Sequence, residues 1–311
     1  MSVFLIIIGL VGLWLGTKWV INAALGIANL FKLSHGFVGV AILAVGTDLP
    51  EVFVTLKASL LQLSGVESSG IITGNAIGSS ISQITVILGI AALLLTFKMP
   101  KSELILNGIF LLLSVVLVYV FGHDGNITRV EGILLIITYL LYYYLLLRNN
   151  KDETTAENEG APNSIPKIIL FLIAGLIVLI GSSHLVVENA MELAKAWGVE
   201  QSFVGIAVIG LGTSLPELAV SIGAAMKKSA AMSVGNVIGS NIFDGLIPIG
   251  LGASITDVKL ESGFLKIDLP LLFFSSLLVI IFLLTKKGMS RLEGITLILV
   301  YLAYITLKMY L

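Results

Sequence analysis

The stretch AVGTDLPE, residues Ala44 to Glu51, places two carboxylic acids and a proline in a run that is otherwise apolar for dozens of residues on either side. A carboxylate near the centre of a lipid bilayer costs at least about 2.5 to 3.5 kcal/mol, so it persists only where something pairs with it. No lysine or arginine lies within the stretch. The pattern therefore favours a cation that comes and goes as the partner of Asp48 and Glu51.

Composition places the chain in a membrane. Of its 311 residues 57% are apolar and 12% charged, and the mean hydropathy is +1.05. Apolar runs of roughly 20 residues, the length that crosses a hydrocarbon core of about 30 Å, recur along the whole chain. We predict ten spans, at residues 3–30, 37–63, 70–97, 104–121, 130–147, 168–193, 203–226, 232–255, 269–284 and 295–311.

Several classes of protein are excluded or disfavoured. The first run begins without a basic segment and ends without a small-residue cleavage site, so it is typical of a span rather than a signal peptide. The chain has no cysteine, which excludes disulfides and thiolate chemistry. Its net charge of −1 offers no basic surface for nucleic acid. Lysine and arginine gather on one side of the predicted spans, eleven against six, which predicts a multi-pass protein of the cell membrane with extracellular termini and a cytoplasmic linker at 149–166.

The chain contains an internal repeat. Residues 37–51, FVGVAILAVGTDLPE, match 203–217, FVGIAVIGLGTSLPE, at nine of fifteen positions, and 74–83, GNAIGSSISQ, match 235–244, GNVIGSNIFD, at six of ten. Each half holds five predicted spans, and an odd number inverts the second half in the membrane. The predicted fold is therefore all-α, with two inverted five-helix repeats at 1–148 and 167–311 joined by the linker, and with broken helices 2, 3, 7 and 8 forming an ion-binding core.

The repeated blocks carry oxygen ligands only. Pro50 and Pro216 each remove a backbone donor and free a carbonyl one turn earlier. Side chains spaced i, i+4 share one helix face. The converging oxygen-bearing residues are Thr47, Asp48, Glu51, Ser79 and Gln83 from the first half and Thr213, Ser214, Glu217, Ser240 and Asp244 from the second. Calcium takes about 6 to 8 such oxygens, whereas zinc and copper prefer histidine or cysteine.

The two blocks are not identical. Asp48 corresponds to Ser214 and Gln83 to Asp244, so each half supplies two acids at different positions. Four acids around one calcium leave up to two negative charges, which predicts additional monovalent ions or protons. Crowded carboxylates also favour protonation of one another, which makes Asp48 a candidate proton carrier.

At these residues the chain resembles the sodium/calcium exchanger family, within the larger cation/calcium antiporter superfamily, over essentially its whole length. The resemblance implies an antiporter of the prokaryotic type, without a calcium-sensing domain, that exchanges calcium for sodium by alternating access. It implies that Glu51 and Glu217 hold calcium, helped by Thr47, Thr213 and the carbonyls of Ala44 and Gly210. It also implies sodium sites that are completed by Ser79, Gln83, Ser214, Ser240 and Asp244.

This sequence departs from the family pattern at two positions. The family commonly has serine in place of Asp48, and asparagine or aspartate in place of Gln83. The alternative of a proton- or potassium-coupled calcium antiporter therefore remains open. A channel with an acidic selectivity ring and an intramembrane hydrolase that uses Asp48 are disfavoured, the first because one chain holds its own repeat. We expect no enzyme activity and no cofactor, and as partners only calcium and sodium ions and the lipid bilayer.

Overall fold

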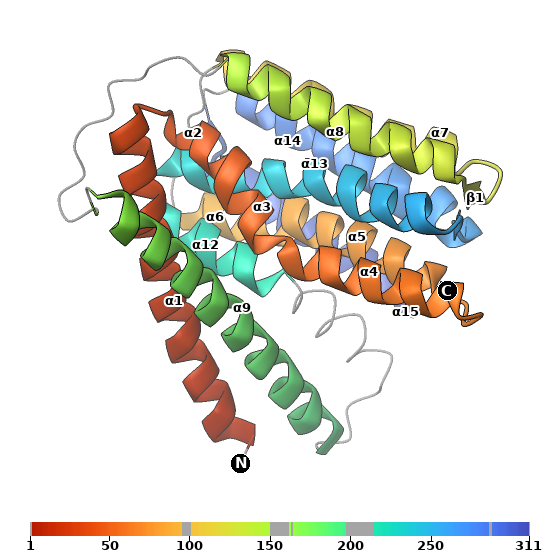
Figure 1. Ribbon diagram of the computed structural model, residues 1–311, viewed down its shortest axis with the longest axis horizontal. Helices are drawn as coiled ribbons and strands as arrows, with labels where there is room; N and C mark the ends of the chain where they lie inside the picture. The colour runs from red at the N-terminus through yellow and green to blue at the C-terminus, as the bar shows by residue number, and fades with distance from the viewer. Residues whose placement is uncertain are drawn as a thin grey trace.

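The computed structural model describes residues 2–94, 101–149, 162, 164–196, 214–285 and 288–310, and these are almost entirely helical (Figure 1). The first half consists of α1 (Ser2–Phe31), α2 (His35–Val38), η1 (Gly39–Leu43), α3 (Ala44–Thr47), α4 (Leu49–Leu63), α5 (Ser69–Ser82), η2 (Gln83–Ile87), α6 (Leu88–Leu94), α7 (Lys101–Phe121), β1 (Asn126–Ile127) and α8 (Arg129–Asn149). The second consists of α9 (Ile165–Ala196), α12 (Leu215–Met226), α13 (Ala230–Ile255), β2 (Val258–Lys259), η4 (Phe264–Asp268), α14 (Leu269–Thr285) and α15 (Arg291–Met309). The segments η1, η2 and η4 are π-helical turns.

Seven of the helical segments in the described ranges are long and apolar enough to cross a membrane, and the bent pair of 35–47 with 49–63 makes an eighth. Helices α12 and α15, at the seventh and tenth predicted spans, are not among these. Residues 203–213 of the seventh span lie outside the described residues. The count of ten spans and the inversion of the repeats therefore stay predictions.

Helices α1 and α9 lie side by side and lean away from the other helices (Figure 1). Glycine lets the two backbones approach closely. A Cβ atom on Gly16 would lie 2.8 Å from the backbone nitrogen of Leu179, and one on Gly175 would lie 2.8 Å from Val20 Cγ2. Small residues of this kind allow helices to pack by van der Waals contact within a bilayer.

Helix α13 is the centre of the remaining bundle and contacts α2, η1, α3, α4, α5, α7, α8 and α12. Its 26 residues form one helix although Pro248 lies within it. The third predicted span is also one span, 69–94, in which η2 is an inserted π turn. The prediction of breaks in the third and eighth spans is wrong, because 69–94 and α13 each continue as one span, the first with the π turn η2 inside it. The break predicted in the second span is present at Asp48, between α3 and α4.

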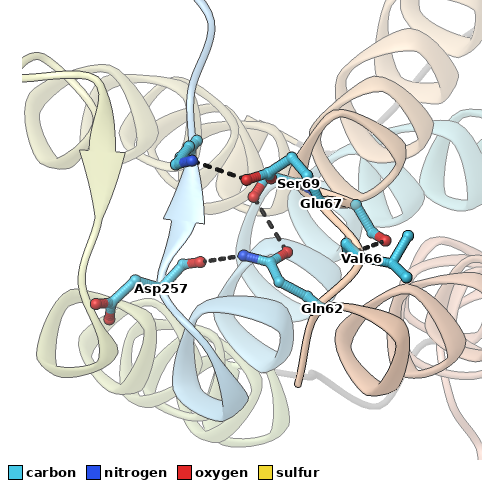
Figure 2. A network of polar contacts seen from close by, with 7 residues as sticks. Gln62, Val66, Glu67, Ser69 and Asp257 are labelled. Carbon is cyan, nitrogen blue, oxygen red and sulfur yellow. Dashed lines mark hydrogen bonds and ion pairs between the residues drawn. The ribbon is translucent and has the colours of Figure 1, made fainter. Parts of the chain in front are cut away.

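A two-stranded antiparallel sheet, β1 with β2, joins the α7–α8 loop to the residues after α13, so the chain is not purely helical. Figure 2 shows the α4–α5 loop tied to the same place. Gln62 Nε2 donates to the carbonyl of Asp257 at 2.7 Å, and Lys259 Nζ lies 2.8 Å from Glu67 Oε2. The hydrogen bond from Lys259, with those from Ser69, lowers the pKa of Glu67 to about 2. These contacts fix one end of the bundle.

Candidate ion-binding site

The residue before the motif's second helix has the same backbone form in both motifs. Asp48, between α3 and α4, has φ −84° and ψ 4°, and Ser214, before α12, has φ −91° and ψ 12°. Pro50 and Pro216 follow in the first turn of the next helix, where a missing N–H costs no helical hydrogen bond. At Asp48 the two helix segments are bent by 40°.

Three acids from the two motifs converge. One carboxylate oxygen from each of Asp48, Glu51 and Glu217 can be chosen so that all three lie within 4.8 Å of one another. Their residues are at most 1% exposed. None of their carboxylate oxygens has a hydrogen-bond partner in the described part of the chain. The ion pairs Lys259–Glu67 and Lys308–Asp268 lie elsewhere.

This spacing suits a divalent cation. Calcium binds oxygen at about 2.3 to 2.6 Å, so two ligands on opposite sides of one ion lie about 4.8 Å apart. Unpaired buried carboxylates are strongly unfavourable, and a bound cation would remove that cost. The chemistry that the cluster can perform is reversible binding of a hard cation, because it offers several oxygens and no sulfur or imidazole.

Asp244, Ser79 and Ser214 form a second group beside the three acids. Ser79 Oγ and Ser214 Oγ lie 3.1 Å apart, and Ser214 Oγ lies 2.9 Å from Ser82 Oγ. Gln83 Nε2 donates to Asp244 Oδ2 at 3.1 Å and to Ser79 Oγ at 2.8 Å. These side chains come from α5, η2 and α13 and from Ser214, directly before α12, so both halves contribute.

The remaining predicted ligands differ in their surroundings. The Thr47 hydroxyl donates to the carbonyls of Leu43 and Ala44 at 3.1 and 3.3 Å, and the Ala44 carbonyl also accepts the N–H of Asp48 at 3.0 Å. Ser240 Oγ is buried without a hydrogen-bond partner among the residues the structure describes. Gly210 and Thr213 lie outside the described ranges.

Sequence reasoning missed Asn241 and Ser82. Asn241 Nδ2 donates to Gln83 Oε1 at 2.9 Å, and Ser82 Oγ donates to the carbonyl of Ser79 at 2.9 Å. Both residues lie in the repeated blocks, and both are polar in apolar surroundings, which was the available signal. Pro248 was also missed. It has no N–H to give to the carbonyl of Asp244, four residues earlier, so that oxygen lacks its usual helical partner.

A small cavity of about 50 Å³ reaches the Glu51 side chain between α4, α5, α9 and α12, and Asn75, Ser183 and Pro216 are among its lining residues. An apolar groove of about 670 Å³ lies next to it between α4 and α9. The two spaces share Pro50, Val54, Ile180 and His184 in their walls. Glu51 of the three-acid cluster therefore faces a cavity on the side of α9.

Known proteins share both the sequence and the architecture. A sequence model described as "Sodium/calcium exchanger protein" matches residues 1–148 and 167–310. The uncharacterized membrane protein MJ0091 of Methanocaldococcus jannaschii is 31% identical over 95% of this chain and 94% of its own length. The sodium/calcium exchanger MaX1 of Methanosarcina acetivorans is 26% identical over 98% of both chains.

A solved structure of the sodium-calcium exchanger NCX_Mj, soaked with sodium and strontium, superimposes with a TM-score of 0.84 at 31% identity, and covers 98% of this chain and 97% of that one. Together with the seven apolar helices, these matches make the chain a multi-pass membrane protein. It belongs to the sodium/calcium exchanger family.

Proposed function

We propose that this protein is a secondary antiporter that exchanges calcium for sodium across the cell membrane by alternating access. The observation that carries the proposal is the cluster of Asp48, Glu51 and Glu217, buried in apolar helices without hydrogen-bond partners in the described ranges. A fixed charge pair would make such acids structural, whereas buried acids without a fixed counter-charge must be neutralised by protons or by a mobile cation. The family supports calcium and sodium as the exchanged ions.

In this proposal the chain crosses the membrane ten times as two inverted repeats, with its termini outside and residues 149–166 in the cytoplasm. The matching backbone at Asp48 and Ser214 supports the repeat, since each precedes a proline and the glutamate of its motif. Inverted repeats can exchange roles between the two sides, so each half alternately opens a site near the midplane.

The calcium site in this proposal consists of Glu51 and Glu217 with Asp48, Thr47, Thr213 and the carbonyls of Ala44 and Gly210. Ser79, Ser214, Ser240, Asp244 and Gln83 form the surroundings of the sodium ions. Several sodium ions can neutralise the charges of the four acids when calcium has left. When calcium is bound, fewer monovalent ions are needed for the same neutralisation. That exchange of charge couples the two ion flows.

The test is calcium uptake into proteoliposomes loaded with sodium. Glu51→Gln and Glu217→Gln should each reduce sodium-driven uptake at least about 100-fold, because each removes a charge that a divalent ion needs. Glu192→Gln, an exposed glutamate on α9, is the matched control and should retain wild-type uptake. Wild-type flux in Glu51→Gln would refute the site, and uptake that follows a pH gradient and ignores sodium would refute sodium coupling.

A further inference from the structure

The orientation of one buried amide is set by a backbone carbonyl. Asn241 Nδ2 donates to the carbonyl of Val237 at 3.1 Å, and a carbonyl can only accept. The amide NH2 of Asn241 must therefore point this way, although amide nitrogen and oxygen are alike in shape. Its second hydrogen goes to Gln83 Oε1 at 2.9 Å. Asn241 and Gln83 are 3% and 0% exposed, so water does not supply an alternative partner.

The orientation of Asn241 fixes that of Gln83. Because Gln83 Oε1 receives a hydrogen from Asn241, its NH2 group must face the other way. There Nε2 donates to Ser79 Oγ at 2.8 Å and to Asp244 Oδ2 at 3.1 Å. Gln83 thus presents a donor, and not its carbonyl oxygen, to the two residues beside it that could hold a cation.

The donor and acceptor roles of the serine hydroxyls can also be assigned. Ser82 Oγ donates to the backbone carbonyl of Ser79 at 2.9 Å, so it must accept from Ser214 Oγ. Ser214 has then used its only hydrogen and must accept from Ser79. Ser79 in turn accepts from Gln83. The network therefore runs from Asn241 through Gln83, Ser79 and Ser214 to Ser82, with a backbone carbonyl at each end.

We propose that Asn241 is a positioning residue that holds the Gln83 amide against Asp244 and thereby weakens sodium binding there. Gln83 Nε2 occupies one lone pair of Asp244 Oδ2, whereas Oδ1 has no hydrogen-bond partner in the described ranges. Because this charge-assisted hydrogen bond offsets part of the negative charge on Oδ2, it weakens the attraction of that oxygen for an ion. Calcium is kept at Asp48, Glu51 and Glu217. This proposal rests on the proposed function.

The test separates sodium from calcium. In sodium-driven calcium flux from proteoliposomes, Gln83→Leu removes the cap on Asp244 and should lower the half-saturating sodium concentration about tenfold, the factor for one such bond. Asn241→Leu lets the Gln83 amide turn and should also lower the half-saturating sodium concentration. The half-saturating calcium concentration should change less than about twofold in both, because its ligands are untouched.

Two controls distinguish positioning from damage. Asn189→Leu removes the same type of amide bond to the carbonyl four residues earlier, on α9, and should leave both half-saturating concentrations unchanged. The double variant Gln83→Leu/Asn241→Leu should match Gln83→Leu alone, because Asn241 acts only through Gln83. A rise in half-saturating sodium in Gln83→Leu would make Gln83 a sodium ligand and overturn the proposal. Equal changes in the half-saturating sodium and calcium concentrations, or no change in either, would also overturn the proposal. Absence of sodium-driven flux in the wild type would instead refute the proposed function.

Discussion

Asp48 adds a third carboxylate to a pair of glutamates that would suffice to bind a divalent ion. Its place at the helix break directs it toward Glu51 and Glu217, and the residue is fully buried. In a site without ions, three such groups repel one another and none has a hydrogen-bond partner among the described residues. Asp48 should therefore raise the affinity for a cation at the expense of the stability of the ion-free protein.

Asp48→Ser tests this balance. We expect the half-saturating calcium concentration to rise about tenfold, because one charged ligand is lost. The thermal midpoint in calcium-free detergent solution should stay level or rise, since a like charge is removed from the interior. Asp124→Ser, in an exposed turn, should change neither calcium affinity nor its sodium dependence. Unchanged calcium affinity in Asp48→Ser would remove Asp48 from the site.

The acids of the site were predictable from the sequence, because charged residues stand out in apolar runs and the repeat marks them twice. The direction in which Gln83 points was not. It depends on Asn241, 158 residues away in the chain, and on the carbonyl of Val237. No sequence pattern encodes which end of an amide faces a neighbour, so the repeat and the resemblance placed Gln83 among the oxygen ligands.

At the level of elements, the site depends on how closely α13 can approach the broken helix. Gly39, in the π turn η1, lies against α13, and a Cβ atom there would be 2.4 Å from the carbonyl oxygen of Met232 and 3.0 Å from the backbone nitrogen of Asn236. Both neighbours are backbone atoms, which cannot turn aside. Glycine at this position therefore sets the distance between α13 and the segment that leads to Asp48.

Gly39→Ala should push the two helices apart. We expect a loss of about 1 to 3 kcal/mol of stability, typical of overpacking, and a lower thermal midpoint together with reduced calcium flux. Gly181→Ala is the matched control on α9, where a Cβ atom would meet nothing within 4 Å. It should be neutral or slightly stabilising, because alanine favours the helix. Equal midpoints for the two variants would show that the contact is not tight.

The positions of helices followed from hydropathy, and where the structure describes them the predicted spans are helical. Hydropathy did not predict which helices are broken or where the short strands lie. The breaks expected in the third and eighth spans were wrong because glycine and serine permit a kink without requiring one. Helix α13 continues as one span through Pro248. The strands β1 and β2 have two residues each, too few to show an alternating pattern.

At the scale of the whole molecule, the pair α1 and α9 stands apart from a bundle built around α13 (Figure 1). The pair contacts that bundle mainly through α12, which follows Ser214, and through α2 and the segments up to Asp48. Both sets of contacts lie next to the motifs that carry the acids. We predict that in the proposed alternating access the pair shifts across these surfaces, so that opposite ends of the site open in turn.

A disulfide can test that shift, since the chain has no cysteine of its own. A Cβ atom on Gly223 of α12 would lie 3.8 Å from Thr17 Cβ of α1, which matches the usual separation in a disulfide. Oxidation of Thr17→Cys/Gly223→Cys should reduce sodium-driven calcium flux at least about tenfold, and reduction with a thiol should restore it. The flux of each single-cysteine variant should not respond to oxidant.

The matched control cross-links two residues that both lie outside the α1–α9 pair. A Cβ atom on Gly122, after α7, would lie 3.4 Å from Leu260 Cβ, after β2, so Gly122→Cys/Leu260→Cys should also form a disulfide. Because neither residue belongs to the α1–α9 pair, its flux should be the same oxidised and reduced. Mass spectrometry after tryptic digestion verifies each bridge. Full flux through a completely bridged Thr17→Cys/Gly223→Cys protein would mean that α1 does not move against α12, and transport would then need a smaller motion confined to the broken helices themselves.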